Sequence, residues 1–536
     1  MKKNKLTSTG NMAELLAGQI ERNPDRVALR IPTEWNDTAV TRYDTMTFGE
    51  MGRRIARYQE GFRNAGYRPG DRIIIMVPPG VELYCLIGAM LASRIVPVLV
   101  DAGMGFGKML MAFADSRARA IISIKKFGRF RYILPRLWRY RFYSVDGSGP
   151  FIRPVGALER EGRDRIEIVP CDREAHGIIT FTSGSTGRPK GADRKHWSML
   201  QQHISLRKSL PDRPGDIDMT CFPVMVLQSL GCGVPSVLAA VDFRAVGSVE
   251  PALIVDQIAA FGPTRLSAAP AFMKRLAEYI VNNGIAVPSL RCIATGGAPV
   301  SRELCRLLVR AFPRAEVRVL YGSTEAEPIS SVTAGEIART RGGGYLVGRP
   351  YPFVTVRIVD LPADPEAVTD HTLKRYALPA GGIGEIAVSG EHVLRGYVDN
   401  PDADRENKIH RPGGGVWHRT GDTGYRDRAG RLWITGRMRD IVRHRGKVIH
   451  PFLVEQDIDA LPGVSRSALV AASDGAAPIL AVALDAPERA DEVMAAVSDS
   501  LVSSGYGDFT VRTVVRIPVD RRHNSKIDRA ELIKLL

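Results

Sequence analysis

The sequence predicts an α/β fold with a large N-terminal domain of α/β sheets, a β-rich subdomain and a small α+β domain at the C-terminus. The chain has 536 residues, too many for one hydrophobic core. Helical and strand patterns alternate through residues 12–100, which favours a sheet of buried parallel strands. The glycine-rich segment 381–390 has a strand pattern, and the segment after residue 440 mixes short helices and strands.

The elements follow one another in a regular order. Apolar residues recur at helical spacing in 12–22, and a second helix begins at Thr47-Phe48. A helix rich in Leu, Ala and Met is predicted over 83–92. Strands are predicted over 27–31, 72–77, 96–100, 177–181 and 290–296, with a basic hairpin over 441–451.

Composition excludes several classes of protein. Hydrophobic residues make up 44% of the chain and charged residues 25%, as in a globular protein. No apolar run is long enough to span a membrane, and the basic N-terminus lacks the apolar region of a secretory signal. The six cysteines are scattered without a CxxC pair, so we expect reduced core thiols, no zinc site and a cytoplasmic protein.

The net charge of +16 indicates an attraction to polyanions. The sequence has no nucleic-acid-binding signature, so we expect no nucleic-acid partner. ATP, CoA and anionic lipid surfaces suit this charge equally well. In residues 125–143 seven Lys and Arg side chains alternate with aromatic and aliphatic ones, without an acid. This segment predicts either peripheral membrane contact or a hairpin whose aromatic side chains pack inward, and Pro135 excludes a long helix there.

A loop rich in glycine and hydroxyl groups follows the strand predicted over 177–181. Residues 182–191 read TSGSTGRPKG, with four hydroxyl side chains, three glycines and one lysine. Glycine lets the backbone approach a ligand closely, and hydroxyl, amide and ammonium groups bind phosphate oxygens. A plain surface turn would rarely follow a core strand and end in Pro-Lys-Gly. Lys190 is followed by Gly191 rather than Ser or Thr, so the loop is a phosphate-binding loop of a kind other than Walker A.

Later motifs supply the other parts of a nucleotide site. The strand over 290–296 leads into Gly296-Gly297, which permits close approach to a flat ring. Residues 321–325 read YGSTE and offer an aromatic face for adenine and a carboxylate for Mg²⁺. Asp422 can accept hydrogen bonds from two ribose hydroxyls. A last motif, over 518–528, contains Lys526.

Together these motifs resemble the adenylate-forming superfamily of acyl-CoA synthetases, peptide-synthetase adenylation domains and luciferases. Six motifs occur in the order of that family, and the resemblance extends from about residue 12 to the end of the chain. It implies an N-terminal adenylation domain over 1–439 that carries the ATP and acyl pockets. It also implies a mobile C-terminal lid domain over 440–536, with Asp440 as the hinge residue.

The resemblance assigns roles residue by residue. The implied catalytic residues are Lys526, Glu325, Lys190 and Thr186, with Glu325 also the Mg²⁺ ligand. The implied nucleotide-binding residues are Thr182, Ser183, Gly184, Ser185, Gly187, Gly296, Gly297, Ala298, Tyr321, Gly322, Ser323, Thr324, Asp422 and Arg437. The apolar stretch after Phe222 places the acyl pocket at Val224, Met225 and Leu227.

The implied reaction is attack of a substrate carboxylate on the α-phosphorus of ATP, which gives acyl-AMP and pyrophosphate. The protein must align two anions and offset developing charge, and Lys526 is expected to bridge the carboxylate and the α-phosphate. Amino-acid-activating relatives carry an aspartate where this chain has Pro223-Val224-Met225. We therefore expect a small-molecule carboxylic acid with an aliphatic or fatty acyl group.

The acyl acceptor has two candidates. The motifs at 222–224, 269–271, 321–325 and 519–526 look most similar to olefin-pathway β-lactone synthetases and to fatty-acid-ligase-like enzymes. Residues 436–440 and 445–447 resemble the thioester-forming pattern. We favour transfer to the thiol of CoA or of a phosphopantetheine carrier protein over β-lactone closure by a β-hydroxy acid.

A third reading is a non-catalytic protein that binds ATP or a lipid surface. The joint presence of Lys190, Glu325, Asp422, Arg437 and Lys526 argues against it.

Overall fold

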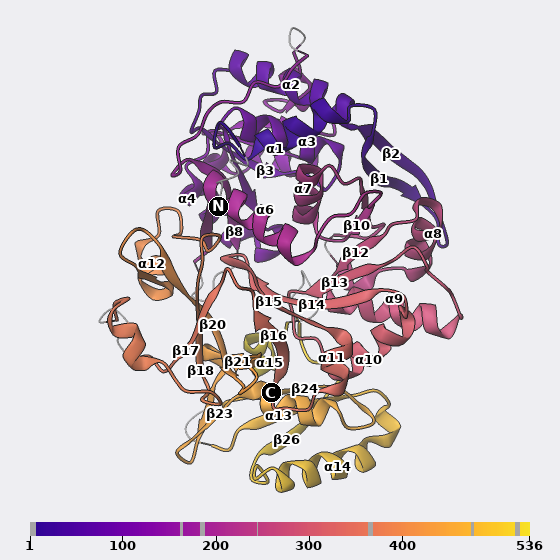
Figure 1. The fold of residues 1–536 in the computed structure, drawn as a ribbon, viewed down its shortest axis with the longest axis vertical. Coiled ribbons are helices and arrows are strands. Elements are labelled where there is room, and N and C mark those ends of the chain that lie inside the picture. The colour runs from indigo at the N-terminus through magenta and orange to yellow at the C-terminus, as the bar shows by residue number, and fades with distance from the viewer. Residues whose placement is uncertain are drawn as a thin grey trace.

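The computed structural model describes residues 7–160, 164–182, 188–243, 245–362, 368–472, 476–519 and 526–536. Part of the predicted phosphate loop lies outside these residues, namely Ser183, Gly184, Ser185, Thr186 and Gly187, and so does the side chain of Thr182. Figure 1 shows the N-terminal half at the top of the molecule and the C-terminal segment at the bottom.

A seven-stranded sheet forms the first layer, with strand order β7-β6-β5-β3-β4-β8-β9. Neighbouring strands are parallel except for the antiparallel pair β8 and β9, which flank the phosphate loop. Its strands are β3 (Arg72–Met76), β4 (Val96–Val100), β5 (Ala120–Ser123), β6 (Arg141–Ser144), β7 (Arg153–Pro154), β8 (His176–Thr182) and β9 (Lys190–Lys195).

The helices of this half cover the sheet and supply its core. Thr47 caps the second helix, because its hydroxyl accepts from the Glu50 amide and the Glu50 carboxylate accepts from the Thr47 amide. The third helix is apolar all round and is buried between the layers. These helices are α1 (Ala13–Arg22), α2 (Phe48–Asn64), α3 (Val81–Ala92), α4 (Phe106–Ser116), α5 (Lys125–Gly128) and α6 (His196–Ser209).

A fourteen-stranded sheet runs through the middle of the molecule. Its parallel part joins β1 (Val27–Trp35), β11 (Ser236–Leu238), β10 (Asp218–Thr220), β12 (Arg265–Ala268), β13 (Cys292–Gly296) and β14 (Glu316–Ser323), with β2 (Val40–Thr47) antiparallel at one edge. Packed on it are α7 (Pro223–Cys232), α8 (Pro251–Phe261), α9 (Pro270–Asn282), α10 (Arg302–Ala311) and α11 (Ala334–Arg339).

The other part of this sheet is antiparallel and contains the β-rich subdomain predicted around 381–390. Its strands are β15 (Ala326–Thr333), β16 (Tyr345–Pro350), β17 (Thr355–Val359), β18 (Gly384–Ser389), β19 (Lys408–His410), β20 (Val416–Arg426) and β21 (Leu432–Arg437), and α12 (Pro401–Asn407) precedes β19. The Ala192–Tyr397 bridge connects this part to the seven-stranded sheet.

The segment after Arg437 forms the predicted α+β unit around its own apolar core. The basic hairpin is present as β22 (Val442–His444) and β23 (Lys447–Ile449). A three-stranded sheet follows, made of β24 (Val464–Val470), β25 (Ile479–Leu484) and β26 (Thr510–Val514), with α13 (Pro451–Asp459), α14 (Ala490–Ser503) and α15 (Arg529–Leu535). No helix in the described part of the chain is long and apolar enough to cross a membrane.

Candidate active site

The predicted adenine wall lies where β13 meets its neighbour β14. A side chain at Gly296 would place its Cβ 2.4 Å from the Leu320 carbonyl oxygen, so this position requires glycine. Gly297 has φ +83°, and a Cβ there would meet no atom within 4 Å. Ala298 follows in the same turn. The backbone here is therefore open to a flat ligand, as the sequence predicts.

Three predicted nucleotide residues from separate motifs meet beside this turn. The Tyr321 hydroxyl on β14 donates to Asp422 Oδ2 at 2.8 Å. Arg437 Nε lies 2.9 Å from Asp422 Oδ1, because β20 and β21 pair with these two residues in register. Burial and the nearby Asp422 charge raise the pKa of Tyr321 well above its usual value. An aromatic ring and an oriented carboxylate thus share one site.

Glu325 lies next to a cluster that sequence reasoning missed. The Tyr397 hydroxyl donates to Glu325 Oε1 at 2.9 Å. Burial alone would raise the pKa of Glu325, but His418, Lys408 and the Tyr397 hydrogen bond outweigh it and lower that pKa to about 2. The carboxylate is therefore ionised. The sequence assigned no role to Tyr397, His418 or Lys408.

Lys408 is a buried cation in this cluster. Its Nζ donates to the Leu394 carbonyl at 2.6 Å and lies 5.4 Å from the centre of the Tyr397 ring. Burial lowers the pKa of Lys408 to about 8, although Glu325 opposes the shift. Burial likewise lowers the pKa of His418 to about 3, so the imidazole is neutral.

Lys190 lies at the start of β9, at the far end of the phosphate loop. It is buried, and its Nζ lies 2.8 Å from Glu406 Oε2 on α12 and 5.8 Å from the Tyr397 ring centre. The Val398 amide donates to the Gly191 carbonyl at 2.8 Å, which fixes this loop end against the β-rich subdomain. Lys190 and Glu325 therefore lie against the same Tyr397 side chain.

The residues present fit ATP and Mg²⁺. The Ser323 hydroxyl is buried without a hydrogen-bond partner among the described residues, as expected of a group that meets a ligand. The described residues contain no group of three or more His, Cys, Asp or Glu side chains that could hold a metal. Mg²⁺ does not require one, since it is commonly held by one or two carboxylates together with substrate phosphates. Gly322 and Thr324 flank Ser323 at the end of β14. The Thr324 carbonyl accepts a hydrogen bond from Arg194 at 3.4 Å.

The remaining predicted residues lie in two other places. Lys526 is exposed in the C-terminal unit, next to the Val519–Ile527 bridge. Asp440 ends the short turn between β21 and β22, with Oδ2 3.8 Å from Arg529 Nη1. The three residues of the predicted acyl pocket differ in their surroundings. Met225 lines a small cavity, Leu227 packs against the hydrophobic core around α2 and α3, and Val224 is 48% exposed.

Comparison with known proteins shows the family of this chain. The model of the AMP-binding enzyme family matches residues 16–398, and the chain belongs to that family. Olefin beta-lactone synthetase from Xanthomonas campestris pv. campestris is 30% identical over 551 aligned residues, which cover 98% of each chain. Feruloyl-CoA synthase from an Amycolatopsis species is 27% identical, over 80% of this chain and 81% of its own.

Solved structures share the fold. The anthranilate CoA ligase AuaEII, in complex with anthranoyl-AMP, superposes with a TM-score of 0.82 at 20% identity and covers 100% of this chain and 99% of its own. The amide bond synthetase McbA from Marinactinospora thermotolerans gives 0.79 at 22% identity, over 98% and 99%. The predicted superfamily, fold class and enzyme class, an AMP-forming acid ligase, are therefore confirmed.

Proposed function

We propose that this protein activates a small-molecule carboxylic acid with ATP and Mg²⁺, forming acyl-AMP and releasing pyrophosphate. The observation that carries the proposal is the convergence of Tyr321, Asp422 and Arg437 through direct contacts. Three motifs that are distant in sequence, each predicted to bind the nucleotide, meet in one place.

Different side chains of the site bind different parts of ATP and Mg²⁺. Asp422 and Arg437 orient the ribose, and Tyr321 and the Gly296-Gly297 turn hold the adenine. Lys190 and the hydroxyls of the phosphate loop bind the phosphates, and Ser323 and Thr324 offer further donors. Glu325, ionised beside Tyr397, would hold Mg²⁺, which offsets charge on the leaving pyrophosphate when it is bound.

We propose that the C-terminal unit, 440–536, moves as a lid relative to 1–439 about Asp440 and brings Lys526 to the reacting groups. Its separate sheets and separate core support this division. The contacts that hold it against the larger part are partly polar, such as His450 Nδ1 to Thr423 Oγ1 at 3.2 Å and the Gly344 amide to Gln456 at 2.8 Å. They are also partly apolar, since the Phe452 ring packs edge-on against Tyr345 with ring centres 5.2 Å apart. Contacts of this kind suit a movable interface.

We propose the thiol of CoA, or of a carrier protein, as the acyl acceptor. Similarity to CoA ligases, feruloyl-CoA synthase among them, supports this choice. β-Lactone closure by a β-hydroxy acid is the second candidate, and the similarity to olefin beta-lactone synthetase over nearly the whole chain specifically favours it.

Acid-dependent release of AMP from ATP separates these two reactions. With a thiol acceptor, we expect AMP release to rise at least about tenfold when CoA or a phosphopantetheine carrier is added. If a 3-hydroxy acid drives the same AMP release without any thiol, and the matching acid without the hydroxyl does not, lactone closure replaces the thiol proposal.

We also propose peripheral membrane contact through segment 125–143. Three large apolar side chains are exposed at this surface, two from the segment itself and Phe151 from the chain just after it. Ile133, Trp138 and Phe151 are 72%, 62% and 79% exposed. Trp138 Nε1 donates to the Arg131 carbonyl at 2.7 Å, and Arg131 Nη1 donates to the Phe151 carbonyl at 3.1 Å, so the three lie close together.

Exposed basic side chains lie in the same segment, and together with Ile133, Trp138 and Phe151 they are called the aromatic-basic surface here. Lys126, Arg129, Arg136 and Arg139 are exposed. Phe127, Leu137, Tyr140, Phe142 and Tyr143 pack inward, so the inward packing that the sequence allowed holds for these five, while the aromatic side chains of Phe130, Tyr132 and Trp138 are exposed. Exposed apolar side chains and cations in one segment suit a surface of anionic lipid, and each cation contributes about 1 kcal/mol near such a surface.

Vesicle binding tests the aromatic-basic surface. We expect the protein to co-sediment with vesicles that contain phosphatidylglycerol, to bind pure phosphatidylcholine more weakly, and to be released at high salt. Ile133→Ser/Phe151→Ser should weaken binding at least about tenfold, since two exposed apolar side chains are lost. The exposed pair Val502→Ser/Val515→Ser is the matched control. Equal binding by both double variants would contradict the proposal.

A further inference from the structure

A buried charged pair lies on the sheet face that leads to the nucleotide site. Asp218, Arg265 and Cys292 stand in register on β10, β12 and β13, and the row of Thr220, Ser267 and Ala294 follows toward the carboxyl ends. Alternate residues of a strand share a face, so Gly296 lies on the same face one row further. About 13 Å of strand separates the Arg265 row from the Gly296 row, at about 3.3 Å per residue.

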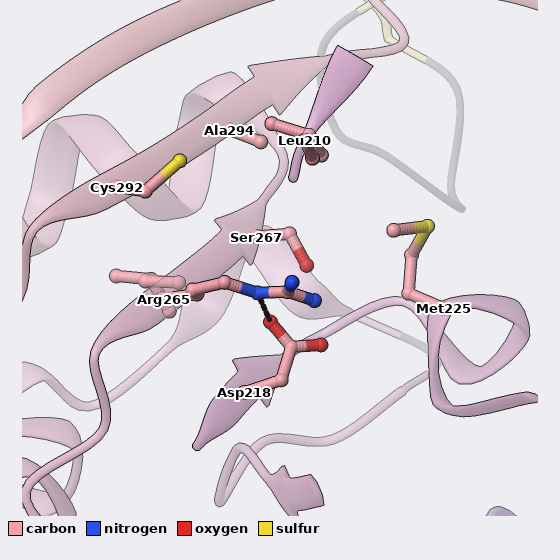
Figure 2. A pocket seen from close by; sticks show the side chains of 8 residues that line it. Leu210, Asp218, Met225, Arg265, Ser267, Cys292 and Ala294 are labelled. Atoms are coloured by element: carbon pink, nitrogen blue, oxygen red, sulfur yellow. Dashed lines mark hydrogen bonds and ion pairs between the residues drawn. The ribbon is translucent and has the colours of Figure 1, made fainter. Parts of the chain in front are cut away.

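A small cavity opens on this face between the sheet and α7 (Figure 2). Asp218, Arg265 and Ser267 line it from the sheet together with the apolar residues Leu266 and Ala294, and Met225 lines it from the helix with a flexible thioether. Methionine adapts readily to the shape of its neighbours. Because Met225 is one of the residues predicted to line the acyl pocket, we take this cavity as the inner end of that pocket.

Arg265 is paired on only part of its guanidinium group. The residue is 6% exposed; its Nε lies 3.3 Å from Asp218 Oδ1 and its Nη1 lies 2.9 Å from Asp212 Oδ1. Its Nη2 makes no hydrogen bond within the part of the chain that the structure describes. Ser229 Oγ donates to Asp218 Oδ2 at 2.8 Å and holds that carboxylate in place. A donor is therefore left over at the inner end of the pocket.

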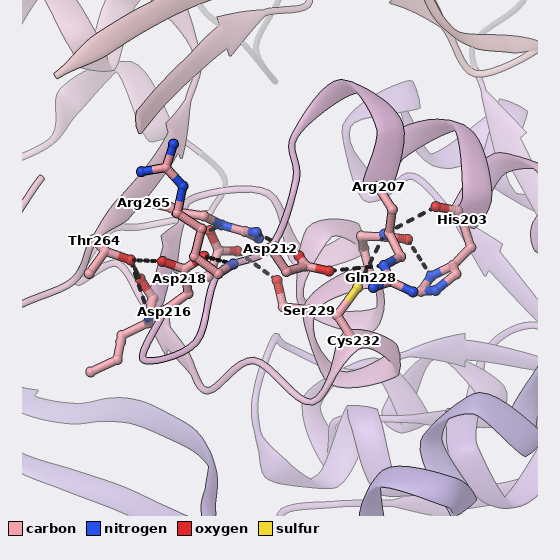
Figure 3. Close-up of polar contacts among 12 residues, drawn as sticks. His203, Arg207, Asp212, Asp216, Asp218, Gln228, Ser229, Cys232, Thr264 and Arg265 are labelled. Carbon is pink, nitrogen blue, oxygen red and sulfur yellow. Dashed lines mark hydrogen bonds and ion pairs between the residues drawn. The ribbon is translucent and has the colours of Figure 1, made fainter. Parts of the chain in front are cut away.

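The surrounding charges already balance. Arg207 Nε lies 2.9 Å from Asp212 Oδ2, so two arginines face the carboxylates of Asp212 and Asp218 (Figure 3). A second carboxylate on a substrate would add negative charge without a partner. A purely aliphatic tail would leave the Arg265 donor unpaired against hydrocarbon. A neutral oxygen atom of the substrate can accept a hydrogen bond from Arg265 without adding charge to the pocket.

We infer that Arg265 is a specificity-determining residue of the adenylation reaction, and that the enzyme takes acids whose far end carries a neutral oxygen acceptor, a hydroxyl or a carbonyl. The inference rests on the proposed function. It replaces the purely aliphatic acyl group expected from the apolar stretch after Phe222 with an oxygenated one. A buried ion pair adds little stability compared with apolar packing. A role of the Asp218–Arg265 pair in recognising the acyl group accounts for its place in the pocket.

Matched acids test this inference. Pyrophosphate exchange is measured with straight-chain acids of increasing length, each with and without a terminal hydroxyl. At the preferred length, we expect kcat/KM to be at least about tenfold higher for the hydroxy acid, the usual effect of one hydrogen bond to a charged group. Arg265→Met/Asp218→Asn should bring this ratio of kcat/KM values to about one.

The control is Arg291→Met/Asp216→Asn, which removes a neighbouring, partly buried pair that does not line the cavity and should keep the wild-type ratio. An unchanged ratio in the Arg265 variant, or no preference in the wild type, overturns the inference. Acyl-sulfamoyl adenosines with the same two tails, followed by thermal shift, distinguish the two proposals. Binding without discrimination between tails overturns only the inference, whereas absence of both binding and exchange overturns adenylation as well.

Discussion

Lys526→Ala is expected to reduce acid-dependent pyrophosphate exchange by at least about 10²–10³-fold, the usual effect of removing one group that stabilises transition-state charge. The proposed lid movement brings the Lys526 ammonium between the substrate carboxylate and the α-phosphate, where two anions must approach each other. Because Lys526 is exposed in this structure, the free energy of unfolding should change by no more than about 0.5 kcal/mol. Exchange of labelled pyrophosphate into ATP measures the first effect and thermal denaturation the second.

The matched control is Lys534→Ala on α15. Lys534 is another exposed lysine of the C-terminal unit, 3.0 Å from Glu531, and should be dispensable for exchange. Undiminished exchange in Lys526→Ala would remove that residue from the reaction and, with it, the reason for the lid movement.

Glu325→Gln should lower exchange by about 10²-fold and raise the Mg²⁺ concentration needed for half-maximal activity. The change keeps the shape of the side chain and an acceptor for the Tyr397 hydroxyl, but it removes the ionised carboxylate proposed to hold the metal. It also removes the negative charge that opposes the fall in the pKa of Lys408, so that pKa should drop below about 8. A titration of exchange rate against Mg²⁺ measures the main effect.

Glu327→Gln serves as the control for Glu325→Gln. It lies two residues further along, on β15, and burial raises the pKa of its carboxyl. A wild-type Mg²⁺ response in Glu325→Gln, or the same loss in Glu327→Gln, would remove the metal assignment from Glu325.

Local patterns in the sequence predicted the fold well. The strand before the phosphate loop, the capped helix at Thr47 and the hairpin after residue 440 each depend on residues that are close together in the chain. Gly296 and Gly297 could be recognised as a special backbone site from the sequence. The structure gives the reason, because Gly296 closely approaches Leu320 and Gly297 has a positive φ. Such constraints act within a few residues and leave a signature in sequence.

The contacts behind the site could not be read in this way. Lys190 meets Glu406, and Glu325 meets Tyr397, across separations that only the assembled sheets create. Lys408 is buried by residues that are distant in the sequence, so the residues next to it in the chain do not predict its burial. The Asp218–Arg265 pair likewise arises from strand register. In segment 125–143 the composition was clear, but which aromatic side chains face solvent depends on packing against the sheet.

The measurement that tests the central claim most directly is acid-dependent exchange of labelled pyrophosphate into ATP by the wild-type protein, across a broad panel of carboxylic acids with Mg²⁺. Adenylation predicts exchange that requires both an acid and Mg²⁺ and that is strongest for a narrow group of acids. Absence of exchange with every acid, from a folded protein that binds ATP, would contradict the account and favour a non-catalytic nucleotide-binding protein.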